Sequence, residues 1–338
     1  MSFIILITTF FILAQNEALP NLPPIPKDNP QTKEKIELGK MLYFDPRLSH
    51  DGTISCNSCH NVMSAGGDDS RSLSMGIRGQ RGGRSAGTVF NAAFYSVQFW
   101  DGRAKSLEQQ AEGPLVDPAE MGNKDHKSVV ERVRKIPGYV TLFGKVFKGK
   151  DPVNLKNLTK AIASYERTLI TPNSRFDLYK RGNAKALSDI ERKGYETFQT
   201  VGCVTCHSGA NFAGPSLPEG TGFYMKFPTF PNTKFDKKYK FSQDEGRFKV
   251  SKNKEDKHMF RVPTLRNIAH TAPYFHNGSV NSLEEAVRVM GQTQLNLELN
   301  KDQVGQIVAF LQALSGSIPE QTMPKLPAVS NQSVVDVQ

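Results

Sequence analysis

Apolar positions recur at helical spacing in four stretches of the chain, and these stretches are its main predicted elements. Residues 33–44 (KEKIELGKMLYF) and 188–198 (SDIERKGYETF) carry apolar side chains three or four positions apart, as amphipathic helices do. The same spacing occurs over residues 154–170 (NLKNLTKAIASYERTLI) and 301–314 (KDQVGQIVAFLQAL). One pair of helices in each half of the chain predicts a mainly α-helical protein built from two similar units.

Helix-boundary residues support two of these helices. Ser188 with Glu191, and Asn300 with Gln303, have the spacing of capping boxes, which satisfy free backbone N–H groups at a helix start. Gly316 follows the last helix, at a position where glycine commonly ends helices. The sequence therefore divides near residues 171–173.

The stretches between the helices lack regular periodicity. Residues 66–87 are rich in Gly, Ser and Arg and predict a long mobile loop, and residues 212–259 combine turns, aromatic residues and lysines. We expect long irregular loops with short β ribbons at most. The predicted organisation is a leader over 1–18, a first helical domain over 19–170, a second over 171–318, and a disordered tail over 319–338.

An apolar run of twelve residues, 3–14, lies at the N-terminus. It is too short to span a bilayer and has the length of a signal-peptide core, although no Lys or Arg precedes it. Ala14 or Ala18 would be the last residue removed, and an uncleaved anchor is the alternative. No later stretch of the sequence is apolar enough to span a membrane. We expect an exported, periplasmic protein without stable membrane insertion.

Composition narrows the choice of partners. The chain has 338 residues, 38% of them hydrophobic, which suits two globular domains. Its formal charge is +10, but the basic residues are scattered and their densest cluster, residues 234–240, has the character of a solvated loop. We expect no nucleic-acid binding. An acidic redox partner is compatible with this charge, which alone does not identify one.

All four cysteines lie in two copies of Cys-x-x-Cys-His, at residues 56–60 (CNSCH) and 203–207 (CVTCH). A redox dithiol or a shared zinc site would use the cysteines but leave His60 and His207 unexplained. Covalent haem attachment uses every residue, because two thioethers hold the porphyrin and the adjacent imidazole binds iron. The motifs therefore predict two haem c groups, attached through Cys56, Cys59, Cys203 and Cys206. With one motif each, the helical domains over 19–170 and 171–318 are expected to be cytochrome c-like.

Met290 is the candidate sixth ligand of the second haem. It precedes the predicted helix at 301–314, where cytochromes commonly place their distal ligand, and the sequence predicts a short helix that Gly291 ends. A core methionine is the alternative. Ligation by His207 and Met290 would raise the reduction potential of the second haem and leave no position on its iron for a substrate.

No sixth ligand is evident for the first haem. Between the first motif and residue 154 the only histidine is His126, which begins a predicted helix. An iron open on one side could bind a small molecule. Glu120 and Trp100 follow the motif, but on their own a surface carboxylate and a core aromatic are the simpler interpretations.

Further stretches resemble the bacterial di-haem cytochrome c peroxidases over about residues 38–314. They are 43–49 (YFDPRLS), 88–91 (TVFN), 99–103 (FWDGR), 113–115 (GPL), 120–121 (EM), 246–248 (GRF), 265–267 (LRN), 273–278 (PYFHNG) and 290–291 (MG). The related methylamine dehydrogenase maturation enzymes are similar in fold but carry Tyr where Met290 stands.

The resemblance implies a role for each haem. The first would be peroxidatic, with His60 as its proximal ligand, Glu120 as acid/base and Gln110 as the distal glutamine. The second would be the high-potential haem, and Trp100 would lie between the two. His276 and Arg247 would contact haem propionates.

The resemblance also implies a calcium ion and partners. Calcium would lie between the domains on the carbonyls of Thr271 and Pro273, with Ser85 where the family has an Asn side-chain ligand. Hydrogen peroxide would be the substrate, a small c-type cytochrome or cupredoxin the electron donor, and a homodimer the assembly.

One departure affects regulation. Many family members carry a histidine in the loop after the first motif, which caps the resting peroxidatic iron; here Ile77 stands at that position, and Met75 is the one nearby substitute. We therefore expect no distal-histidine off-switch. A non-catalytic electron-transfer cytochrome and a di-haem oxidase of a protein partner are the alternative functions.

Overall fold

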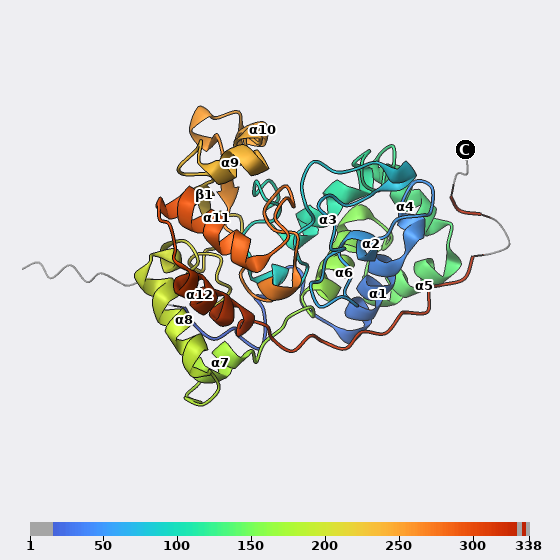
Figure 1. The fold of residues 1–338 in the computed structure, drawn as a ribbon. Coiled ribbons are helices and arrows are strands. Elements are labelled where there is room, and N and C mark those ends of the chain that lie inside the picture. The colour runs from blue at the N-terminus through green and yellow to red at the C-terminus, as the bar shows by residue number, and fades with distance from the viewer. Residues whose placement is uncertain (1–15, 330–332, 336–338) are drawn as a thin grey trace, which may run out of the picture.

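The computed structural model describes residues 16–329 and 333–335, which form two helical lobes (Figure 1). The predicted mainly α-helical fold is confirmed. The first lobe contains α1 (Lys33–Phe44), α2 (Cys56–Cys59), α3 (Leu107–Val116), α4 (His126–Arg134), α5 (Pro137–Val146) and α6 (Leu155–Glu166). The second contains α7 (Arg175–Lys180), α8 (Asp189–Thr200), β1 (Tyr224–Lys226), α9 (Lys234–Tyr239), α10 (Phe248–Ser251), β2 (Met259–Arg261), α11 (Leu283–Leu295) and α12 (Lys301–Gln312).

Each lobe is built around two helices that cross closely, and at each crossing a glycine lets the two backbones approach. A Cβ atom on Gly39 of α1 would lie 1.8 Å from the carbonyl oxygen of Ala161 in α6. A Cβ atom on Gly194 of α8 would lie 2.0 Å from the carbonyl oxygen of Gln306 in α12. Only a residue without a side chain lets the backbones approach this closely. The two lobes therefore repeat one architecture, with each crossing adjoining a hydrophobic core.

Helix boundaries follow the sequence signals at most ends. The capping boxes of α8 and α12 are present as predicted. The helix that carries Met290 is longer than expected, because it continues through Gly291 and ends at Asn296 in the left-handed conformation. Gly291 instead provides room, since its Cβ would lie 3.1 Å from both Leu297 and Leu299.

The segments without periodicity are largely irregular, as expected. Within residues 212–259 and just beyond, β1 and β2 form one short antiparallel ribbon. The loop at residues 66–87 contains a bridge between Met75 and Arg81 and a short 3₁₀ turn at Ile77–Gly79, and it is held to the rest of the chain by contacts such as the Ser85 N–H to the His276 carbonyl. Parts of both segments line the cavities that contain the candidate site residues, for example Ser85 and Met225.

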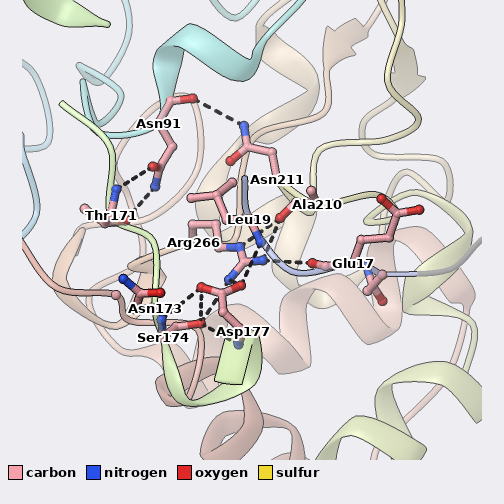
Figure 2. A network of polar contacts seen from close by, with 12 residues as sticks. Glu17, Leu19, Asn91, Thr171, Asn173, Ser174, Asp177, Ala210, Asn211 and Arg266 are labelled. Atoms are coloured by element: carbon pink, nitrogen blue, oxygen red, sulfur yellow. Dashed lines mark hydrogen bonds and ion pairs between the residues drawn. The ribbon is translucent and has the colours of Figure 1, made fainter. Parts of the chain in front are cut away.

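The segment at residues 171–173 joins the lobes through a buried polar network (Figure 2). The Asn91 carboxamide donates to Thr171 Oγ1 at 2.8 Å and accepts from the Thr171 backbone N–H at 2.9 Å. Asn267 donates to the same Thr171 oxygen from the second lobe. The division near Thr171 is thus a fixed joint between the lobes, because three buried polar groups satisfy one another there.

A fully buried ion pair stabilises the second lobe beside this joint (Figure 2). Arg266 Nη1 lies 2.7 Å from Asp177 Oδ1, and both side chains have no exposed surface. Arg266 also donates to the carbonyls of Ala210 and Glu17, while Asp177 accepts from the N–H of Leu19. The pair therefore attaches the segment at residues 16–19 to the second lobe.

The C-terminal segment differs from the expected disordered tail. Residues 316–329 run along the first lobe as an extended strap (Figure 1). Tyr165 donates its hydroxyl to Gln321 Oε1 at 2.8 Å, and Arg47 donates to the carbonyl of Pro327 at 2.9 Å. The strap makes hydrogen bonds with side chains of the first lobe, an arrangement that its composition did not indicate.

Among the residues described, no helix is long and apolar enough to cross a membrane. The apolar run expected to be an export signal, residues 3–14, lies outside the described residues.

Glycine at the crossing in the second lobe is predicted to be essential for stability. Gly194→Ala should lower the free energy of unfolding by about 1–3 kcal/mol, because the methyl group would overlap the Gln306 carbonyl. Gly305→Ala in α12 is the matched control, since its Cβ would meet nothing within 4 Å. The control should gain about 0.5–1 kcal/mol from helix propensity. Chemical denaturation of both variants measures the difference, and equal effects would contradict the crossing.

Candidate haem sites

The first Cys-x-x-Cys-His motif lies on α2 at the edge of a cavity in the first lobe, here called the first cavity. Cys59 and His60 line it. His60 Nδ1 lies 2.8 Å from the Gly87 carbonyl, and the Tyr43 hydroxyl donates to the His60 carbonyl at 2.7 Å. Burial lowers the pKa of His60 and favours the neutral ring. With Nδ1 engaged, Nε2 is the nitrogen that remains for a metal.

The second motif lies at the edge of another cavity, here called the second cavity, and repeats this arrangement. Cys203, Cys206 and His207 line it. His207 Nδ1 lies 3.0 Å from the Phe212 carbonyl, and Asn16 donates to the His207 carbonyl at 2.8 Å. Both histidines are therefore oriented by a backbone carbonyl through Nδ1 and anchored through their own carbonyl.

The competing interpretations of the cysteines find no support in this geometry. Burial raises the pKa of Cys59 to about 11 and that of Cys203 to about 12, whereas a reactive dithiol needs a lowered pKa. Within the part of the chain that the structure describes, no three His, Cys, Asp or Glu side chains converge to hold a metal ion. The four cysteines therefore form no shared zinc site, and two partly buried pairs at the cavities fit covalent haem attachment.

Glu120 and Gln110 both line the first cavity, although they come from different elements. Gln110 projects from α3, and Glu120 follows the turn after that helix. Burial, with a smaller contribution from Asp117, raises the pKa of Glu120 to about 7, and Arg103 opposes the rise. A carboxyl group with a pKa near neutrality can both accept and return a proton.

Ile77 turns away from the first cavity. Its backbone N–H donates to the Glu120 carbonyl at 2.9 Å, and its side chain packs where a Cβ on Gly122 would be. Met75 is exposed by 37% and does not line the cavity either. Of the described residues, His60 is the only histidine or methionine that lines the first cavity.

Met290 projects from α11 into the second cavity, which it shares with His207. Most of the other lining side chains are apolar, among them Phe227, Val287 and Leu311. Met225 on β1 also lines this cavity, although no sequence pattern singled it out. The two cavities thus differ in their methionines: among the described residues none lines the first cavity, whereas Met225 and Met290 line the second, most of whose wall is apolar.

Trp100 lies in the wall that separates the two cavities. The wall residues, which line both, are Ser85, Ala86, Gly87, Thr88, Tyr95, Trp100 and Arg261. Trp100 Nε1 donates to the Ser85 carbonyl at 2.9 Å, and its ring meets the edge of the His276 ring, with the centroids 6.3 Å apart. The indole is therefore fixed between the two sites.

The two residues expected to contact haem propionates, His276 and Arg247, lie in different places relative to the cavities. His276 is buried, lines the second cavity and stacks on Phe260. Arg247 lines neither cavity, because its guanidinium donates to the Asp101 carbonyl at 2.8 Å and to the Tyr224 hydroxyl at 3.0 Å. The propionate contact of Arg247 therefore stays a prediction, and in this structure the arginine contacts the backbone next to Trp100.

The three residues expected at a calcium site all line the second cavity. Ser85, Thr271 and Pro273 line it, and so does Asp68. A Cβ on Gly66 would be 2.4 Å from the His270 carbonyl oxygen and 2.8 Å from Asp68 Oδ1. Burial raises the pKa of Asp68 to about 6. Sequence reasoning missed this buried carboxyl group.

Comparison with known proteins decides the family. The family model for di-haem cytochrome c peroxidase matches residues 33–185. Cytochrome c551 peroxidase of Nitrosomonas europaea is 44% identical over 95% of this chain and 90% of its own length. The chain belongs to the di-haem cytochrome c peroxidase family. It is a haem c enzyme of the cytochrome c peroxidase type.

Other relatives agree with this assignment. Cytochrome c551 peroxidase of Pseudomonas aeruginosa is 44% identical over 94% of this chain and 92% of its own length. The methylamine utilization protein MauG of Methylorubrum extorquens is 33% identical over 91% of this chain and 86% of its own length. Among solved structures, a MauG-like protein associated with microbial copper homeostasis superposes with a TM-score of 0.77 at 27% identity, covering 90% of this chain and 96% of that one.

Several residues of this di-haem peroxidase were not predicted from the sequence. Arg261 lies in the wall, where its guanidinium stacks 3.6 Å from the centroid of Tyr95 and donates to the Phe99 carbonyl. Glu166 lines the first cavity from the end of α6. Neither residue has a local sequence signal: the partners of Arg261 are distant in the sequence, and Glu166 meets the cavity only through the packing of α6.

Proposed function

We propose that this enzyme reduces hydrogen peroxide to water in the first cavity, with electrons that enter through the second. The first haem would be held by Cys56, Cys59 and His60, and the second by Cys203, Cys206, His207 and Met290. The observation that supports this best is the difference between the cavities. The first offers an ionisable carboxyl and no second histidine or methionine, and the second offers a thioether.

Glu120 carries the proton chemistry in this proposal. Peroxide must lose a proton from one oxygen and gain one on the other before the O–O bond breaks. The ionised carboxylate accepts the first proton and returns it to the departing oxygen, which leaves as water. The Gln110 amide orients the peroxide by hydrogen bonding. When bound, the haem supplies the metal site for peroxide and the electrons for its reduction.

Trp100 lies where electrons would pass. The wall residues separate the cavities by a single layer, and Trp100 is its largest side chain. Its hydrogen bond to the Ser85 carbonyl fixes the indole. On the far side, a His207 and Met290 ligand pair in an apolar cavity favours a high reduction potential, because a thioether stabilises Fe(II) and burial disfavours the added charge of Fe(III). Met290 also argues against the oxidase of a protein partner, whose relatives carry Tyr there.

The proposed enzyme lacks a distal-histidine off-switch. Ile77 packs against Gly122 and cannot bind iron, and Met75 points away from the first cavity. The Ile77 N–H holds the Glu120 backbone instead. In this chain the loop therefore positions the acid/base segment.

A calcium ion is proposed beside the wall. Calcium prefers oxygen ligands, and the Thr271 and Pro273 carbonyls could bind it together with Ser85. Asp68 would add the carboxylate that Ser85 cannot provide, because the Asp68 side chain is buried and forms no ion pair with another described residue. This fits the residues present, whereas a serine alone would leave the site without an anionic ligand.

The location, the assembly and the electron donor of the enzyme complete the proposal. We infer export to the periplasm, a homodimer, and a small c-type cytochrome or cupredoxin as donor. The net charge of +10 would favour association with an acidic donor. These inferences rest on the sequence and on the family.

The open first site predicts activity without prior reduction. The diferric protein, mixed with hydrogen peroxide and reduced cytochrome c, should oxidise the cytochrome at once. Absorbance of the cytochrome follows the reaction. If turnover appears only after one-electron reduction, the off-switch exists and Met75→Leu should remove it. If neither the diferric nor the one-electron-reduced protein oxidises the cytochrome, the non-catalytic electron carrier would be favoured.

The pKa of Glu120 predicts the pH dependence of the reaction with peroxide. The carboxylate is the active form, so kcat/KM for peroxide should rise as the pH increases through about 7 and then level off. Glu120→Gln should lower it by about 10²–10⁴-fold above pH 7 and remove the rise with pH, because glutamine cannot ionise. Asp117→Asn is the matched control: it retains an oxygen acceptor but removes the neighbouring charge, so the midpoint should move to lower pH. An unchanged profile in Glu120→Gln would contradict the assignment.

A further inference from the structure

A second carboxyl group lines the first cavity and has no part in the peroxide chemistry. Glu166 is the last residue of α6 and is 7% exposed. Its Oε2 atom is shut off from solvent and makes no hydrogen bond among the described residues. Buried carboxyl groups usually have a partner, so one that has none at a cavity wall calls for an explanation.

The polar groups around Glu166 are already engaged with other partners. Arg167, the next residue, donates to both oxygens of Glu108 at 2.7 and 3.0 Å. The Tyr165 hydroxyl is directed to Gln321, and the Tyr43 hydroxyl donates to the His60 carbonyl. None of these groups neutralises Glu166 as a dedicated partner.

The charges that face Glu166 come from each neighbouring element. Arg167 favours its ionised form, Glu108 of α3 opposes it, and Glu120 lines the same cavity. Cys56 of α2 is close enough for Glu166 to raise its pKa, but a thioether at this position carries no charge. Burial dominates and raises the pKa of Glu166 to about 8.

We propose that Glu166 binds a proton when the first haem is reduced and releases it when that haem is oxidised. Oxidation of the iron adds one positive charge beside a poorly solvated carboxyl group, and Coulomb attraction then favours the carboxylate. Reduction removes that charge, and the neutral acid is restored. One electron and one proton therefore enter together and leave together. This inference rests on the proposed attachment of the first haem to Cys56 and Cys59.

The test is a spectroelectrochemical titration of the intact di-haem protein at a series of pH values. The midpoint potential of the first haem should fall as the pH rises around about 8, by up to about 59 mV per tenfold change in proton concentration for a one-proton, one-electron couple. In the Glu120→Gln background, where Glu120 cannot add a slope of its own, Glu166→Gln should remove this slope, because glutamine resembles the neutral acid and cannot ionise. The midpoint potential of the second haem is the internal control and should depend on pH in the same way with and without Glu166→Gln.

Glu120→Gln is the matched control in the same cavity and should keep the slope. A slope that survives when Glu166→Gln is added to Glu120→Gln, or that disappears in Glu120→Gln alone, would overturn the proposal. Redox-induced infrared difference spectra give a second readout that does not require the Glu166 variant to fold. In Glu120→Gln, reduction should produce a protonated-carboxyl C=O band, and its absence would also overturn the proposal. A wild-type spectrum with only one haem would instead refute the proposed haem attachment.

Discussion

The wall between the two cavities is the constraint on which the rest of this structure depends. One layer of residues must form the boundary of a catalytic cavity on one side and of an electron-transfer cavity on the other. Arg84, next to Ser85, fixes this layer across the lobes: it contacts Asp101 at 2.7 Å and Asp244 of the second lobe at 2.7 Å. The same arginine holds the pKa of Asp244 well below its usual range. Such partly buried, hydrogen-bonded pairs fix geometry more reliably than exposed ones.

Different chemistry follows on the two sides of this wall. The lobes share their glycine crossing, their motif and the hydrogen bonds of their histidines, so the repeated fold does not itself distinguish the sites. The distinction comes from the segments between the helices. The turn after α3 brings Glu120 to the first cavity, and α11 brings Met290 to the second. A repeated scaffold therefore supports unlike functions through its connecting segments.

Local signals predicted the helices and the attachment motifs. Capping boxes and apolar spacing located α8 and α12, and the spacing alone located α1. Glu120, Gln110 and Trp100 needed the family resemblance, because a lone polar or aromatic side chain has no local feature that distinguishes it. Arg261 was missed because its partners, the Tyr95 ring and the Phe99 carbonyl, are distant in the sequence. The strap at residues 316–329 escaped prediction for a similar reason, since its contacts depend on its fold-determined position beside Arg47 and Tyr165.

The central claim is that the two irons differ in their resting coordination, with the first open and the second held by His207 and Met290. Low-temperature electron paramagnetic resonance of the diferric protein tests this most directly, because the spin state of Fe(III) reports its axial ligands. The account predicts one high-spin signal from the first haem and one low-spin signal from the second, and only the low-spin signal should change in Met290→Ala. Two low-spin signals in the wild-type protein would contradict it.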